Sequence, residues 1–169
     1  MEIKYQTVLN NNPVIRPTAG DMADGRDHSF VLKPLTIDEI ISLETTYNSG
    51  NQFPTSLREL LFIAGQDCYV LDYGLNENQE EMQDDARGWL VDRSLNIITR
   101  PFFVIDVHRG SSVFLFVYLD EGINDPIVYQ ADLDSNLDPS YSRLMSLEAG
   151  LSSFVNARIS YLLRGINPY

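Results

Sequence analysis

The sequence predicts an α+β fold, with a central, mostly antiparallel sheet of about four to six strands flanked by two N-terminal-side helices and a C-terminal helix. Three features predict this fold. Two amphipathic helical patterns follow one another between residues 36 and 65. Two apolar, β-branched and aromatic runs then surround a short turn at Gly110, and apolar residues recur at helical spacing over 144–163.

We expect one folded domain over residues 35–169, preceded by an irregular leader, residues 1–34, that packs on it. The whole chain has 169 residues, close to the usual size of a single domain. In the leader, Pro13, Pro17 and the stretch from 20 to 25 interrupt any continuous periodicity.

The first helix is expected to begin after Thr36 and to end near Tyr47. Thr36 and Glu39 have the spacing of a capping box, in which each residue's side chain bonds to the other's backbone N–H. The face that this helix buries is expected to comprise Ile37, Ile40, Ile41 and the aliphatic part of Glu44.

The second helix is expected to begin near Pro54 and to stop at Gly65. Ser56 and Glu59 again have capping-box spacing. Its buried stripe is expected to comprise Leu57, Leu60, Leu61 and Ala64.

The middle of the chain changes in character. Residues 68–73 form a short apolar and aromatic run that predicts a strand. Residues 77–87 are polar almost throughout and predict either a solvated helix or an acidic loop beside Trp89, the only tryptophan. Cys68, the only cysteine, is expected to be a small core residue, because an intramolecular disulfide needs a second cysteine.

The clearest β signal is a predicted hairpin of residues 102–107 and 113–118 around the turn at 109–112. Both runs are continuously apolar, which predicts central strands covered on both faces. Residues 127–129 are expected to continue the sheet, and 144–163 to form the closing helix, weakened at its glycine.

The chain is strongly acidic, with 24 Asp and Glu against 12 Lys and Arg and a net charge of −12. Residues 67–138 carry fifteen acidic residues and four arginines, so a net −11 falls in less than half of the chain. Such charge disfavours binding to nucleic acids and to anionic membrane surfaces. No secretory signal or apolar run of membrane-spanning length is visible, which favours a cytoplasmic location.

The order of these elements, with the residues at their joints, resembles the SUKH superfamily over about residues 36–160. The segments that carry the resemblance are 40–47, 53–65 (FPTSLRELLFIAG), 101–106, the turn at Gly110, 114–120, 126–129 and 146–159. Ala64-Gly65 stands where the family often has two glycines, and the leader has no counterpart. The superfamily includes fungal cell-wall synthesis regulators and bacterial immunity proteins that are paired with polymorphic toxins.

The resemblance implies a non-enzymatic protein-binding domain, in a bacterium an immunity protein that binds and neutralises a cognate toxin. The alternative is a cytosolic scaffold or regulator without a toxin partner. We expect a protein partner with a basic surface, since an acidic inhibitor associates quickly with one. We expect no nucleic acid, membrane or cofactor to bind, and a monomer or weak homodimer.

Few residues predict catalysis or metal binding. His108 follows Asp106 by two positions, so the pair could share a strand face and act as a base, although a solvated turn histidine is the more common case. Asp132, Asp134 and Asp138 lack the glycine and closing glutamate of a calcium loop, and turn-stabilising Asx residues explain them as well. We therefore expect no catalytic residue and no metal site.

The candidate contacts with a partner come from two acidic segments and one aromatic residue. Crowded carboxylates are either merely solvated or kept for a partner, and the uneven charge leaves both readings open. The residues expected to bind the partner are Glu80, Glu81, Asp84, Asp85, Trp89, Asp120, Glu121 and Asp125.

Overall fold

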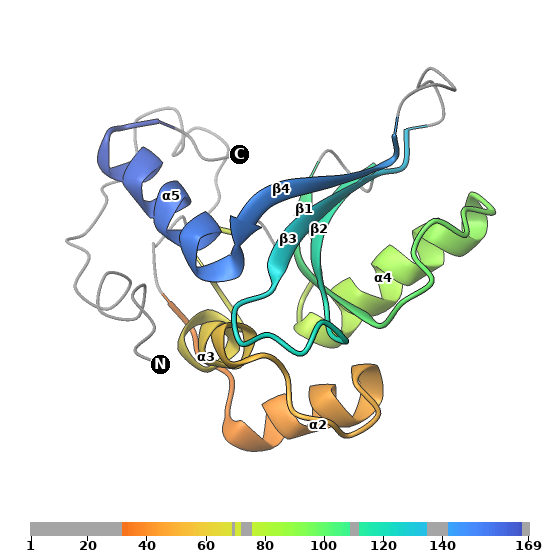
Figure 1. Ribbon diagram of the computed structural model, residues 1–169. Coiled ribbons are helices and arrows are strands. Elements are labelled where there is room, and N and C mark those ends of the chain that lie inside the picture. Colours follow the sequence, from red (N-terminus) through yellow and green to blue (C-terminus); the bar gives the residue numbers. More distant parts are fainter. Residues whose placement is uncertain (1–31, 69, 72–75, 109–111, 135–141, 167–169) are drawn as a thin grey trace.

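The structure is a computed structural model that describes residues 32–68, 70–71, 76–108, 112–134 and 142–166. The predicted leader therefore lies almost wholly outside the described residues. Within them, the α+β prediction is confirmed: four helices surround a four-stranded antiparallel sheet of order β1-β2-β3-β4 (Figure 1). The elements in chain order are α2 (Ile37–Tyr47), α3 (Thr55–Ala64), α4 (Gln79–Asp92), β1 (Phe102–His108), β2 (Val113–Tyr118), β3 (Ile127–Asp132), β4 (Leu144–Gly150) and α5 (Leu151–Leu163).

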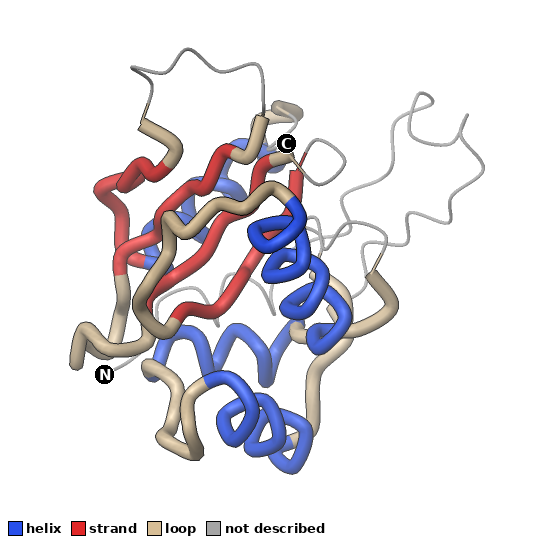
Figure 2. Tube along the Cα trace, turned by 90° about the vertical axis from the view of Figure 1, so that its right-hand side faces the viewer, coloured by secondary structure: helices blue, strands red, loops and turns tan. Residues whose placement is uncertain are grey.

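The sheet separates two hydrophobic cores, because successive strand residues point to opposite faces. On one face, Phe103, Ile105 and Leu115 pack in a core with residues of α2, α3 and α5. On the other face, the aromatic residues Phe114 and Phe116 pack with apolar residues of α4. Figure 2 faces the right-hand side of Figure 1 and shows α4 in front of the strands. Both faces of the hairpin are therefore buried, as predicted.

The first helix forms as its sequence predicts. Thr36 is the N-cap of α2, and both hydrogen bonds of the capping box with Glu39 are present. The predicted buried face needs correction: Ile40 is buried with Leu43 and Glu44, whereas Ile37 and Ile41 are nearly half exposed. The reason is that α2 packs over one narrow stripe, and the two exposed isoleucines flank it.

The second helix has its predicted buried stripe but not its predicted cap. Pro54 is the N-cap of α3 and makes no side-chain cap, and Ser56 lies buried inside the first turn. The backbone N–H of Ser56 donates instead to the carbonyl of Asn124 (2.9 Å). The helix ends at Gly65, where a Cβ would lie 2.6 Å from both Leu35 Cγ and Leu61 O. Close packing therefore requires this glycine.

The predicted hairpin forms, with its turn residues 109–111 outside the described part. A bulge in β1 lets Ile105 and Asp106 both oppose Leu115, since the register moves from the Val104–Phe116 pair to the Asp106–Leu115 pair. The bulge directs Asp106 towards α5, where it meets Arg158.

Three predictions about the sheet are wrong. Among the described residues β1 is the edge strand of the sheet, so only β2 of the hairpin is central. Of the predicted strand 68–73, residues 68, 70 and 71 are buried in the core and lie in a turn, and the other three fall outside the described part of the chain. Residues 144–150 form β4 against β3, and the closing helix begins only at Leu151.

Strand pairing overrides helical periodicity before Gly150, the N-cap residue of α5. A Cβ at Gly150 would lie 2.8 Å from Asp125 Oδ2, so a larger residue here would displace that carboxylate. Asp125 uses this space to accept hydrogen bonds from the N–H and the hydroxyl of Ser152 (2.9 and 2.6 Å). The α5 N-terminus is thus capped by a distant carboxylate.

Part of the polarity of helix α4 is explained by side chains that bond it to the backbone of neighbouring segments. Gln79, Gln83 and Arg87, one turn apart, donate to the backbone carbonyls of Gly65, Val104 and Phe102, each at 2.8 Å. Gln83 Oε1 also accepts from the N–H of Val104 at 2.8 Å, so one buried amide pairs with both polar groups of an edge residue. An apolar stripe of Met82, Ala86 and Leu90 packs beside these contacts.

Replacing Gln83 by alanine is expected to destabilise the protein by about 2–4 kcal/mol, because two buried backbone groups of Val104 lose their partner. The free energy of unfolding, measured by urea denaturation, checks this. Gln66→Ala, at an exposed glutamine, serves as the control and should change stability by less than about 0.5 kcal/mol. Equal stability of the two variants would show that the amide does not hold the β1 edge.

Candidate functional site

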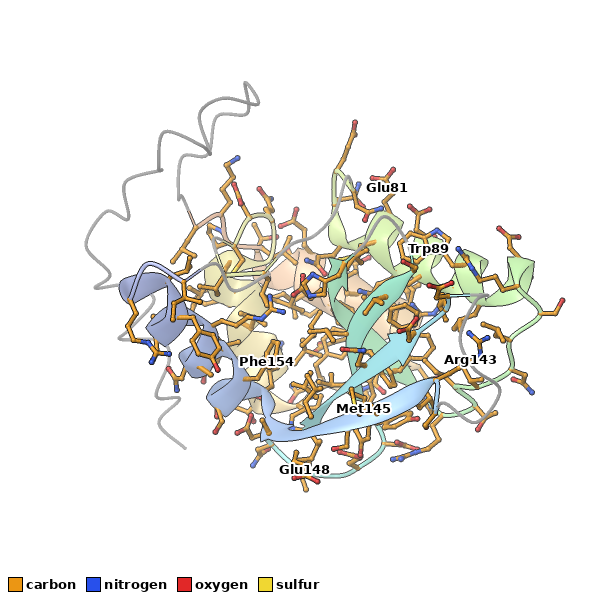
Figure 3. The ribbon with its side chains drawn as sticks, turned by 90° about the horizontal axis from the view of Figure 1, so that it is seen from above. Glu81, Trp89, Arg143, Met145, Glu148 and Phe154 are labelled. Carbon is orange, nitrogen blue, oxygen red and sulfur yellow. The ribbon has the colours of Figure 1, made fainter. Side chains whose placement is uncertain are left out.

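The solvent-facing side of α4 gathers one of the two predicted acidic groups. Glu80, Glu81, Asp84 and Asp85 are all exposed and occupy the first two turns of the helix. Figure 3 shows Glu81 projecting from α4 on the side away from the strands. We call the stripe Glu81, Asp85, Gly88 and Asp92, with Asp84 and Val91 on its flank, the outer face of α4.

The charges on this face are only partly explained by the helix itself. Glu80 and Glu81 lie in the first turn, where the helix dipole favours negative charge. Asp84 and Asp85 lie beyond it, and Asp92 is the last residue, where the dipole opposes negative charge.

Neutral groups, not cations, hold these carboxylates. Asp84 Oδ1 accepts from the hydroxyl of Tyr47 (2.9 Å), Asp85 Oδ2 from the amide of Asn76 (2.8 Å) and Glu81 Oε2 from the backbone N–H of Glu77 (2.6 Å). Among the described residues, the ion pairs formed by Lys and Arg involve other carboxylates. The side chains are therefore oriented while their charge remains available to a partner.

A cleft of about 530 Å³ lies next to this helix, between the loop that follows α2 and the start of β1. Its lining residues are Thr46, Tyr47, Asn48, Ser49, Asn51, Gln52, Arg87, Arg100, Pro101, Phe102, Leu119 and Asp120. Asn48 and Asn51 donate to backbone carbonyls of their own loop, at 3.0 or 3.1 Å. These bonds fix the conformation of the loop, in which the backbone of Ser49 and Gly50 is left-handed.

Arg87 and Tyr47 join the cleft to the acidic helix. The Arg87 guanidinium lies between two rings, 4.6 Å from the centre of Tyr47 and 4.4 Å from that of Phe102. Burial lowers the pKa of Arg87. The pKa of Tyr47 is raised well above its usual value, mainly by burial and also by the hydrogen bond to Asp84. Arg87 donates to the carbonyl of Phe102 on the inner side of α4, and of the four acidic residues it interacts electrostatically with Asp84.

The second predicted acidic group is mostly neutralised. Arg100 binds Asp120 at 2.6 Å, lies 3.7 Å from Glu121 and stacks 4.0 Å above the ring of Tyr118. These hydrogen bonds lower the pKa of Asp120. Asp120 lines the cleft, and Tyr47, which holds Asp84, lines it too. The cleft therefore lies between parts of the two acidic groups.

The structure places Asp125 and Trp89 in other roles. Asp125 caps α5 and does not join the acidic helix. Trp89 is partly buried and packs against the core between α4 and the sheet. The structure thus gathers four predicted residues, Glu80, Glu81, Asp84 and Asp85, on one helix, and places Asp120 in the wall of the neighbouring cleft.

The candidate catalytic pair does come together, beside the buried ion pair of Asp106 with Arg158. His108 Nε2 lies 3.0 Å from Asp106 Oδ2, as the shared strand face predicts. Asp106 is fully buried and lies 2.6 Å from Arg158 Nη1, and the same nitrogen donates to the carbonyl of Val70 (3.1 Å). This cluster joins β1 to α5.

Other reactive side chains are held in the interior. Burial raises the pKa of the Cys68 thiol to about 12, which keeps it protonated near neutral pH. Asp132 Oδ1 accepts from the N–H of Asp134 (3.0 Å), an Asx turn as predicted for that segment.

Sequence reasoning did not identify the residues that shape this site. Tyr47, Arg87 and Arg100 come from three separate segments, and only the folded chain brings them to one cleft. One signal was available for Arg87: it lies four residues after Gln83, which itself lies four after Gln79, a helical polar stripe.

We find no match for this chain among protein-family models, curated proteins or solved structures. The described residues form an α+β domain in which the acidic helix α4 exposes one face to solvent. None of the helices in the described part of the chain is both long and apolar enough to cross a bilayer.

Tyr47→Phe tests the link between cleft and helix. The raised pKa of Tyr47 means that the folded state resists its ionisation, so this residue's contribution is complete below pH 10 and declines as the pH rises further. The wild-type melting temperature should therefore fall more steeply above pH 10 than that of Tyr47→Phe. Parallel curves for the two proteins, recorded by circular dichroism from pH 8 to 11, would contradict this.

Proposed function

We propose that this protein is a non-enzymatic binding domain whose acidic helix α4 contacts a basic protein, and that the partner is a bacterial toxin which it neutralises in the cytoplasm. The observation that carries the proposal is the outer face of α4, where the carboxylates of Glu81 and Asp85 are oriented by neutral donors and form none of the salt bridges found among the described residues. The resemblance to immunity proteins of the SUKH superfamily supports the toxin as the class of partner.

The physical case rests on what this arrangement costs. Glu80 with Asp84 and Glu81 with Asp85 are like charges at i,i+4, each pair destabilising a helix by about 0.2–0.5 kcal/mol. A basic surface would relieve both repulsions on binding. It would also be attracted from a distance, which raises the association rate at low salt.

A pull-down with the product of the neighbouring gene tests the proposal. We expect a stoichiometric complex whose association rate falls as the salt concentration rises, because screening weakens the attraction between exposed charges. Stopped-flow or surface plasmon resonance measurements between 50 and 500 mM salt, roughly spanning Debye lengths from above 10 Å to below 5 Å, would record the trend. If the product of the neighbouring gene does not bind, a scaffold or regulatory role becomes the better explanation. If a complex forms but does not depend on salt, the partner contacts a surface other than the outer face of α4.

Neutralising two carboxylates of the outer face tests its part in binding. Glu81→Gln combined with Asp85→Asn keeps the size and the acceptor oxygens but removes two charges, so association should slow about tenfold at low salt. The control, Asp38→Asn with Glu148→Gln, removes the same charge from exposed positions on α2 and β4. Equal slowing in both double variants would mean that net charge, not this helix, drives association.

A further inference from the structure

Gly88 lies in the interior of α4, where a glycine costs about 1 kcal/mol relative to alanine. Glycine in a folded chain ordinarily has a reason within the fold, either a left-handed backbone or a neighbour too close for a Cβ. The other five glycines in the described part of the chain each have such a reason. Gly50, Gly122 and Gly165 have positive φ, and a Cβ at Gly65 or Gly150 would lie under 3.0 Å from another residue.

Gly88 has neither reason. It is not in the left-handed region, and a Cβ built on it would meet nothing within 4 Å beyond the backbone of its own helix turn. Alanine would therefore fit in the free protein and would favour the helix. The chain bears a cost here that its own packing does not explain.

Gly88 lies among the acidic residues on the outer face of α4. Glu81, Asp85, Gly88 and Asp92 follow one another at spacings of four, three and four, so they share one face of the helix. Val91, three residues after Gly88, is 75% exposed. The glycine thus leaves a low point in the helix surface, with carboxylates on both sides and an apolar side chain beside it.

We propose that Gly88 is the point where a basic segment of the partner crosses α4 in direct contact with its backbone. Arg or Lys side chains of that segment would reach Asp85 on one side and Asp92 on the other, and its apolar part would cover Val91. A missing Cβ allows two backbones to approach closely, and the complementary charge selects a basic segment. This inference rests on the proposed function and names the contact within it.

Gly88→Ala is expected to have opposite effects on the free protein and on the complex with the partner. In the free protein the melting temperature should rise by about 2–4 °C, the shift that 1 kcal/mol produces in a chain of this size. Affinity for the neighbouring gene's product, measured by isothermal titration calorimetry, should fall tenfold or more because the methyl group blocks the approach. Ser153→Ala, at an exposed position on α5, is the control and should leave affinity unchanged.

Each outcome is decisive. A higher melting temperature with lower affinity supports the contact. A higher melting temperature with wild-type affinity overturns it while leaving the proposed function intact, and an unchanged or lower melting temperature shows that the fold itself needs the glycine. If the wild-type protein does not bind the neighbouring product at all, the proposed function fails and this inference fails with it.

Discussion

The side-chain amide of Gln83 supplies β1 with what a neighbouring strand would otherwise provide. It donates to the carbonyl of Val104 and accepts from its N–H, both at 2.8 Å and both fully buried. An unpaired, buried strand edge is costly, and an exposed one invites pairing with other chains. With the edge closed by α4, β1 can be apolar on both faces and still end the sheet.

The same contact sets the orientation of α4. Since Gln79, Gln83 and Arg87 face the backbone of Gly65 and β1, and Met82, Ala86 and Leu90 face the core, the stripe of Glu81, Asp85, Gly88 and Asp92 lies on the opposite side of the helix. The direction of the acidic residues is therefore a consequence of how the sheet edge is satisfied. On the opposite face, the buried pair of Asp106 and Arg158 attaches α5 to β1 in a comparable way.

Much of this fold could be predicted from local patterns, and the failures share a cause. The capping box at Thr36 and the hairpin depend on neighbours in the sequence, so their residues are sufficient to predict them. The strand 144–150 depends on β3, and the position of β1 at the edge depends on Gln83 of α4. For the site, the exposed carboxylates of α4 were predictable from charge alone. The cleft was not, because Tyr47, Arg87 and Arg100 meet only through long-range packing.

Three local preferences of helices are broken in α4. Helix α2 has a complete capping box, and α3 buries an apolar stripe. Helix α4 instead carries like charges at i,i+4, an aspartate at the end where the dipole opposes it, and an interior glycine with open space around it. Each departure alone is small, about 0.2–1 kcal/mol. Natural sequences keep such conflicts chiefly where function requires them. All three lie on the surface of α4, and the basic partner that we propose would relieve or use each of them.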